Sequence, residues 1–299
     1  MLMAMTIRNP VEWGWDQILH AAEALGLANR SLHRTSEHLY SARPTIRHIH
    51  LADIRDVLRK GFQDFGAYRT DVIFLCIVYP IAGLIFARMA FQYEMIPLIF
   101  PLASGFALVG PFAGLGLYEM SRRREISLQR SQEHHASWTH AFSVFRNPNF
   151  GAMLTLGLIL TALLVLWLMT AWWIYESING PQPLESWGLF IQNVFTTQAG
   201  WWLIVAGCGI GFLFAALAMT ISVIAFPLML DRSDIGLATA VGTSIRTVWE
   251  NPVVMAGWGL TVVAGLIVGS LPLFIGLVIT LPVLGHATWH LYRKLIAPK

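Results

Sequence analysis

The sequence predicts an all-α, polytopic membrane protein with six transmembrane helices. We expect them to form three hairpins, each preceded by a cytoplasmic amphipathic helix. Of the 299 residues, 56% are hydrophobic and only 12% are charged, whereas soluble domains average about 25% charged residues. The mean hydropathy is +0.58, and the apolar residues form long, continuous runs. This composition excludes a soluble enzyme, a nucleic-acid-binding domain and a disordered chain.

The first 50 residues are predicted to form a cytoplasmic amphipathic helix followed by a basic tether. Asn9 and Pro10, followed by Glu12, are typical of a helix start, and Gly26 is a plausible helix stop. The rest of this region is rich in Arg and His, so we expect it to lie along anionic lipid head groups. Residues 51–299 are predicted to form the six-helix membrane domain.

Six apolar runs are long enough to cross a bilayer, which takes about 20 residues of helix. They are Val72–Ala90, Ile96–Tyr118, Ala152–Tyr175, Trp201–Leu230, Val253–Leu271 and Leu273–Tyr292. A β-barrel would instead show short segments of alternating hydrophobicity. We expect Pro227 to kink or end the long fourth run because proline removes a backbone donor. The fifth and sixth runs meet in a tight hairpin around Ser270 and Pro272.

The basic residues predict the orientation of these spans. Nineteen of the 20 Lys and Arg residues lie on one side, and the exception is Arg88 at the end of the first run. The loop Glu176–Gly200 contains no Lys or Arg. Since basic loops stay in the cytoplasm, both termini are predicted to be cytoplasmic. An outer aromatic belt is expected at Trp172, Trp173, Tyr175, Trp201 and Trp202.

Three amphipathic helices are predicted from apolar residues spaced three and four apart. Their stripes are Ile54, Val57, Leu58 and Phe62; Trp138, Ala141, Phe142 and Phe145; and Ala238, Val241, Ile245 and Trp249. Asp64, Asn147 or Asn251 follows each stripe and is expected to cap the next helix. These regularities predict three tandem repeat units, over residues 51–125, 134–233 and 234–295. The alternative is that every helix leaving the membrane plane needs a cap and a turn.

Three pairs of glycines are spaced four apart within the spans. They are Gly110 and Gly114, Gly207 and Gly211, and Gly265 and Gly269. Small residues at this spacing let membrane helices approach closely, so internal packing is the favoured interpretation and dimerisation the alternative. Both cysteines, Cys76 and Cys208, lie in apolar runs and are interpreted as packed thiols.

His286 and His290 are the candidate metal site. They are four residues apart in the sixth span, so both project from one helix face, and imidazole nitrogen is a common metal ligand. Glu119 and Asp231 end other spans on the same side and are the possible further ligands. The alternative, which we favour, is structural: the histidines hydrogen-bond to a carboxylate or a carbonyl. No cofactor and no catalytic residues are predicted.

Four stretches resemble an uncharacterised bacterial family of predicted six-span integral membrane proteins, a domain of unknown function. They are FGAYRTDV at 65–72, PLASGF at 101–106, LYEMSRRRE at 117–125 and LPVLGHATWHLYRK at 281–294. The resemblance covers roughly residues 53–295 and implies a multi-pass protein of the bacterial inner membrane. Some relatives are labelled cytochrome c oxidase subunit I. A haem–copper core needs more spans and more buried histidines than this chain offers.

These observations favour a non-enzymatic inner-membrane protein that acts as an accessory, scaffold or assembly component. Its expected partners are the lipid bilayer, anionic head groups at the cytoplasmic face and another membrane protein, with no nucleic acid. One alternative is a small permease for a neutral or amphiphilic solute. A respiratory-oxidase-associated haem or metal protein is another. A continuous polar cavity would favour the permease, and a solid core with an exposed apolar groove would favour the scaffold.

Overall fold

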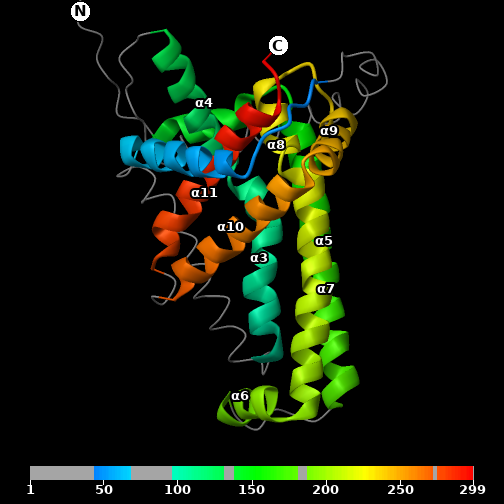
Figure 1. Cartoon of the computed structure of the whole chain (residues 1–299). Helices are drawn as coiled ribbons and strands as arrows, with labels where there is room; N and C mark the ends of the chain where they lie inside the picture. The colour runs from blue at the N-terminus through cyan, green and yellow to red at the C-terminus, as the bar shows by residue number, and fades with distance from the viewer. Residues whose placement is uncertain (1–43, 69–95, 131–137, 181–186, 272–274, 299) are drawn as a thin grey trace, which may run out of the picture.

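The computed structural model describes residues 44–68, 96–130, 138–180, 187–271 and 275–298, which are built almost entirely of helices. After a helix over 52–68 come η2 (Ile96–Leu98), α3 (Ile99–Ala113), α4 (Leu115–Gln129), η3 (Trp138–Arg146), α5 (Phe150–Asn179), α6 (Trp187–Thr196), α7 (Gln198–Ser222), α8 (Ala225–Asp231), α9 (Leu237–Glu250), α10 (Pro252–Ser270) and α11 (Leu277–Leu295) (Figure 1). The predicted all-α class is confirmed over these ranges.

Four stretches of helix are long and apolar enough to cross a membrane. They are Ile99–Gln129, Phe150–Asn179, Gln198–Asp231 and Pro252–Ser270. The expected first span, Val72–Ala90, lies outside the described residues, as does most of the expected N-terminal region 1–50. The expected sixth span, Leu273–Tyr292, corresponds to α11, which is not among the four because its second half is polar. The six-span count and the layout of three hairpins are therefore not confirmed.

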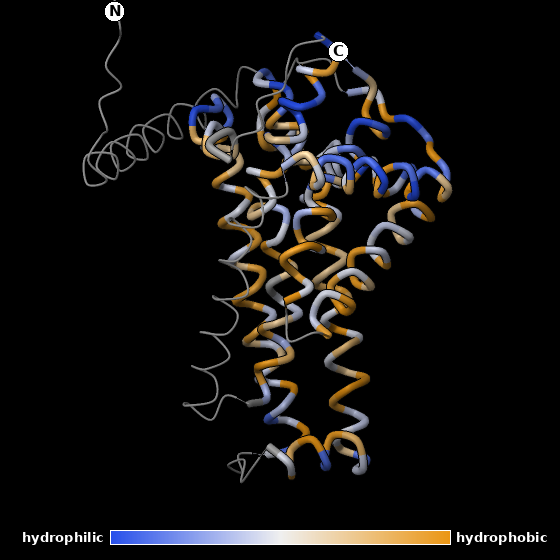
Figure 2. Tube along the Cα trace, turned by 90° about the vertical axis from the view of Figure 1, so that its left-hand side faces the viewer, coloured by the Kyte–Doolittle hydropathy of each residue, from blue (hydrophilic) through white to orange (hydrophobic). Residues whose placement is uncertain are grey.

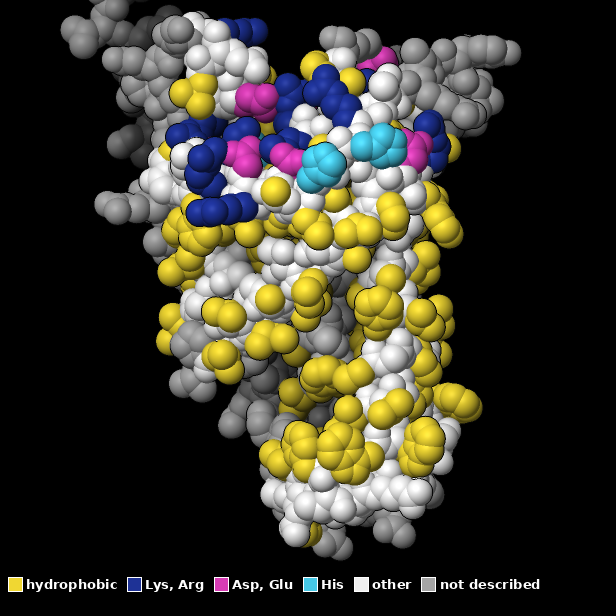
Figure 3. All heavy atoms as spheres, in the orientation of Figure 1, with side chains coloured by type: hydrophobic (Ala, Val, Ile, Leu, Met, Phe, Trp, Pro, Cys, Tyr) yellow, Lys and Arg dark blue, Asp and Glu magenta, His cyan; other side chains and the backbone are white. Residues whose placement is uncertain are grey.

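One end of the bundle gathers the charged residues. The helix over 52–68, α4, η3, α8, α9 and the second half of α11 lie together there, and we call them the charged cap (Figure 1). Hydrophilic residues concentrate in the cap, whereas α5, α7 and α10 are mostly hydrophobic (Figure 2). In the space-filling view, a band of Lys, Arg, Asp, Glu and His borders a largely apolar wall (Figure 3). At the opposite end lies α6, an element that the sequence analysis did not anticipate (Figure 1).

Two long helices break where they enter the charged cap. α3 and α4 meet at Gly114, and α7 gives way to α8 one turn before Pro227. The Ser244 hydroxyl of α9 donates to the Thr220 carbonyl at 2.8 Å and accepts from the Ile224 amide at 3.3 Å. It thereby replaces the helical bond between these two residues, which is a known cause of kinks. The expected kink at Pro227 is present, and Ser244 stabilises it.

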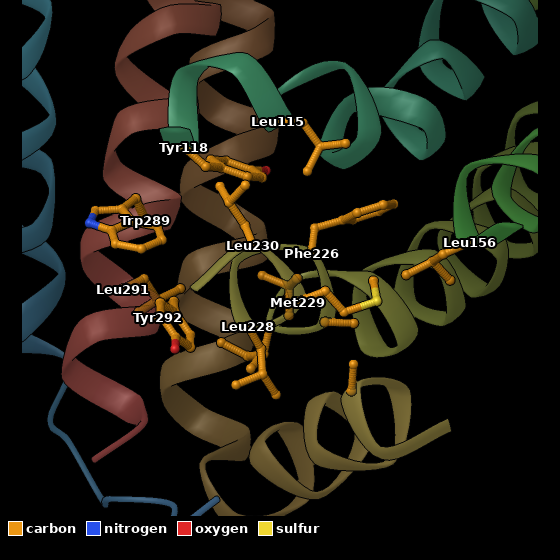
Figure 4. Packing of buried hydrophobic residues seen from close by; sticks show 14 of the residues in the cluster. Leu115, Tyr118, Leu156, Phe226, Leu228, Met229, Leu230, Trp289, Leu291 and Tyr292 are labelled. Carbon is orange, nitrogen blue, oxygen red and sulfur yellow. The ribbon is translucent and has the colours of Figure 1, made fainter. Parts of the chain in front are cut away.

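The hydrophobic core extends into the charged cap. Phe226 and Met229 of α8, Tyr118 of α4, and Trp289 and Tyr292 of α11 pack there and are almost completely buried (Figure 4). Burying one such side chain contributes roughly 1.5–3 kcal/mol. The second half of α11 is thus held firmly against α4 and α8, and this packing positions its histidines.

The glycine pairs only partly serve helix packing. A Cβ on Gly269 would lie 2.8 Å from Leu277, and one on Gly265 would lie 3.1 Å from Thr280, so α10 approaches α11 closely. Gly211 faces Trp167 of α5 in the same way, at 3.0 Å. Gly207, in contrast, has nothing within 4 Å. Cys208 is exposed, so its interpretation as a packed thiol was wrong.

The aromatic ends of the three predicted stripes are largely exposed, although the Phe145 ring makes an edge contact with Phe150 at the start of α5. Phe62 is 57% exposed, Phe145 is 45% exposed and Trp249 is 76% exposed. In α9 the buried face is instead small and hydroxyl-bearing, and includes Ala240 and Thr247. The hydroxyls on this face are satisfied by nearby carbonyls, for example Thr247 by Thr243 at 2.8 Å. Trp249 at the end of the α9 stripe is therefore available to lipid, whereas Val241 of the same stripe packs against the core.

Candidate functional site

Asp64 is the centre of the polar site, and it lies inside the helix over 52–68. The expectation that Asp64 caps the next helix was wrong, because this helix continues to Tyr68. Its buried face consists of Ile54, Val57, Gly61, Asp64 and Tyr68, which are three or four residues apart. This spacing places them on one side of a helix. The Asp64 carboxylate is thus turned into the protein.

Two glycines bring the three helices of the site together. A Cβ on Gly61 would lie 2.7 Å from the Val283 carbonyl oxygen and 2.8 Å from the Ala287 Cβ, both in α11. A Cβ on Gly285 of α11 would lie 2.5 Å from Leu117 of α4. Gly61 faces backbone atoms of α11 and is required for this approach, whereas a Cβ at Gly285 would force the Leu117 side chain to move. Asp64 can consequently reach side chains on α4 and α11.

The Asp64 carboxylate binds three side chains from these two helices. The Ser121 hydroxyl donates to Oδ2 at 2.6 Å, and the His290 Nε2 group donates to the same oxygen at 2.8 Å. The Arg124 guanidinium forms an ion pair with Oδ1. Asp64 therefore ties the helix over 52–68 to both α4 and α11.

His286 continues this hydrogen-bond chain into the protein. Its Nδ1 lies 2.8 Å from the Ser121 hydroxyl. Because that hydroxyl gives its only proton to Asp64, it must accept one from Nδ1. The His286 ring is fully buried, and its Nε2 has no hydrogen-bond partner within the described residues. The Tyr68 ring stacks beside it, with ring centroids 6.2 Å apart and an interplanar angle of 11°.

The surroundings of Asp64 keep the carboxylate charged. Burial alone would raise its pKa, but the hydrogen bond and positive charge of His290, with the Ser121 hydrogen bond, hold the pKa below its usual value. Burial and the nearby Asp64 charge raise the pKa of Tyr68. At neutral pH the site thus combines a carboxylate with a protonated phenol.

The structure places the predicted site residues in separate networks. His286 and His290 belong to the Asp64 network, whereas Glu119 accepts from Arg122 and Arg123 at 2.7 Å each. Asp231 also bonds elsewhere: it accepts from the Tyr292 hydroxyl at 2.7 Å. Within the described residues, no three His, Cys, Asp or Glu side chains form a group that could hold a metal. Metal binding by the histidine pair stays a prediction.

Sequence reasoning missed the two residues that join the histidines. For Asp64, a usable signal was present, since it continues the three-and-four spacing of Ile54 and Val57 on the buried face. An acid on that face points to a buried partner. Ser121 had no comparable signal. It directly precedes three consecutive arginines, which make this segment look like a charged surface.

A second set of ion pairs surrounds the site. Glu125 accepts from Trp289 Nε1 at 3.0 Å and pairs with Arg293 at 2.9 Å. Lys294 lies 2.7 Å from Asp53 and 3.0 Å from Asp56. The Lys294 contact is the main reason why the pKa of Asp56 is lowered to about 2. These pairs again connect α11 with α4 and with the helix over 52–68.

Residues 99–231 match the DUF2189 family, described as a predicted integral membrane protein. The expected resemblance to an uncharacterised family of integral membrane proteins is confirmed over this range. The match spans α3 to α8 and includes Ser121, but it leaves out Asp64 and both histidines. It supports neither a cytochrome oxidase label nor a six-span count. No curated protein and no solved structure matches the chain.

Proposed function

We propose that the chain is a non-enzymatic accessory, scaffold or assembly component of a membrane. The observation that carries this proposal is the pairing of acids in the charged cap. Asp64, Glu119, Glu125 and Asp231 all accept from side chains around them, and each of the four links different helices. Such pairing stabilises a fixed arrangement of helices, whereas a catalytic acid or base must remain accessible to a substrate.

The apolar walls offer a surface for a partner. In the apolar 18-residue stretch of α10, only 22% of the span is buried inside the protein, and the same share for α5 is 28%. Leu260, Ile267 and Val268 of α10 are all more than half exposed. In a bilayer such a wall faces lipid tails or another membrane helix. The scaffold proposal assigns the α10 wall to a second membrane protein.

The proposed setting is the inner membrane, with both termini in the cytoplasm. The exposed aromatic side chains of Phe62, Phe145 and Trp249 support contact with the cytoplasmic leaflet, since such rings favour membrane interfaces. Exposed basic side chains nearby, such as Arg55 and Arg246, suit anionic head groups. The same proposal treats 51–125, 134–233 and 234–295 as three repeat units. The breaks before α4 and α8 support this for the first two units.

Native mass spectrometry of the protein, extracted with its lipids, tests the scaffold proposal. We expect a stoichiometric complex with another membrane protein that is lost in Leu260→Trp. Leu158→Trp on α5 is the matched control, because Leu158 is 61% and Leu260 is 71% exposed. A protein that stays alone and mediates flux of a neutral solute in proteoliposomes would instead support the permease.

A further inference from the structure

A pocket of about 370 Å³ opens beside Asp64 at the surface of the charged cap. It lies between the helix over 52–68, α4 and α11, and its lining includes Lys60, Asp64, Arg124, Glu125, His290 and Arg293. Its size is at the lower end of the range for small-ligand sites, roughly 300–1,000 Å³. The pocket can therefore hold one small polar group.

The lining carries an excess of positive charge. Four basic side chains line the pocket: Lys60, Arg124, Arg293 and Lys294. The lining has only two acids, Asp64 and Glu125. Both acids already accept hydrogen bonds: Asp64 from Ser121 and His290, and Glu125 from Trp289 and Arg293. An entering group therefore meets acids that already accept hydrogen bonds, and basic side chains that outnumber these acids in the lining, although each of them also pairs with an acid.

Three donors on the pocket wall remain available. Arg124 directs Nη1 at Asp64, and its Nε and Nη2 have no partner among the described residues. Lys60 is held only loosely, with 3.5 Å between its Nζ and Asp56, and its side chain is 43% exposed. The exposed Gln63 amide also lines the pocket and has no partner in the described ranges. These donors come from two different helices and converge on one space.

We propose that this pocket binds a phosphate-bearing anion, either a lipid head group or a small soluble phosphate compound. A guanidinium presents parallel N–H groups that match phosphate oxygens, and an ammonium adds a mobile positive charge. Leu128 lines the pocket and is exposed, so a ligand with an apolar part finds a surface beside the charged donors. The site is independent of the scaffold proposal, which needs no ligand in the charged cap.

A matched pair of variants tests the site. Lys60→Gln and Arg59→Gln each remove one positive charge from the same helix, and both residues pair with Asp56. Only Lys60 lines the pocket. The full-length protein is titrated with inorganic phosphate by calorimetry, and in a second arm its binding to phosphatidylcholine vesicles with and without phosphatidylglycerol is measured. Gln63→Glu, which adds a negative charge to the wall, serves as a third variant.

We expect saturable binding in at least one arm, weakened about fivefold by Lys60→Gln and more by Gln63→Glu, with Arg59→Gln close to the wild type. Binding in the phosphate arm identifies a soluble ligand, and binding in the vesicle arm alone identifies a lipid. Higher salt should weaken either interaction because it screens exposed charges. Two results would overturn the proposal: no binding in either arm, or equal losses in Lys60→Gln and Arg59→Gln. Thermal unfolding of each variant confirms that its fold is intact.

Discussion

A single buried carboxylate holds three segments of the charged cap together. Asp64 accepts from Ser121 and His290 and pairs with Arg124. Removing its charge would leave those groups without a counterion in a partly dry environment. A buried acid in this position is therefore expected to matter far more for stability than the less buried Asp53 and Asp56 on the same helix.

Asp64→Asn should destabilise the protein by about 3 kcal/mol, the lower end of the range for broken buried ion pairs, since Arg124 is partly exposed. The measurement is thermal unfolding in detergent. Asp56→Asn on the same helix is the control, because Asp56 is more exposed than Asp64 and pairs with the exposed side chains of Arg59 and Lys60, and such pairs are worth about 0–1 kcal/mol. Equal losses in the two variants would contradict the central role of Asp64.

Stability should also depend on pH through Asp64. Its pKa is lowered from the model-compound value of 3.8, so the charged form contributes stability that is complete above that value. The contribution is lost as the pH falls through the lower pKa of the folded protein. We expect a nearly constant melting temperature from neutral pH to about pH 5 and a decline below about pH 4. Asp64→Asn should show a shallower decline, and an identical profile would argue against this cause.

His286 and His290 are expected to be structural. In the double variant His286→Ala, His290→Ala, Asp64 and Ser121 lose their imidazole partners, which should cost about 1–3 kcal/mol. Elemental analysis and an absorption spectrum of the purified wild type provide the other readout. Stoichiometric metal, or a Soret band that disappears in the double variant, would show that the histidines bind a metal or a haem.

At the scale of helices, close approach decides where the polar groups meet. The helix over 52–68 lies against α11 because Gly61 leaves room for the backbone at Val283. Gly66 on the same helix has nothing within 4 Å. These two glycines therefore provide a matched comparison of a packing position and an open one.

Gly61→Ala should destabilise the protein by about 1–3 kcal/mol, since the added methyl group forces the two helices apart. Gly66→Ala should be neutral or stabilising by up to about 1 kcal/mol, because alanine favours the helix. Chemical unfolding of both variants measures the difference. If Gly61→Ala were as stable as Gly66→Ala, the close contact with α11 would not be needed.

For the whole molecule, the charged cap makes the orientation testable. Reporter fusions after Arg232 and Lys294 should report the cytoplasm, and a fusion near Pro183 should report the opposite side. Lys294 lies in the second half of α11 and Arg232 directly follows α8, both at the charged cap, so their fusions should agree. A cytoplasmic signal near Pro183 would exclude the predicted topology.

The sequence alone determined the class of the protein and the location of several of its helices. Hydropathy over some 20 residues and the separation of charges along the chain are local properties, and both can be read without coordinates. They correctly indicated the apolar helices α5, α7 and α10 and the gathering of charge near Arg124 and Lys294. The amphipathic stripes could also be recognised in the sequence. The sequence did not show which way the stripe of α9 faces.

Only the tertiary structure decided which groups meet. His290 and Asp64 are 226 positions apart in the chain, and Ser121 and Asp64 are 57 positions apart. Their contacts depend on how closely three helices approach at Gly61 and Gly285 and on how α11 is rotated. Those quantities follow from packing between distant segments, so no local pattern contains them. Sequence spacing placed both histidines on one helix face, but it could not show that Ser121 and Asp64 join them.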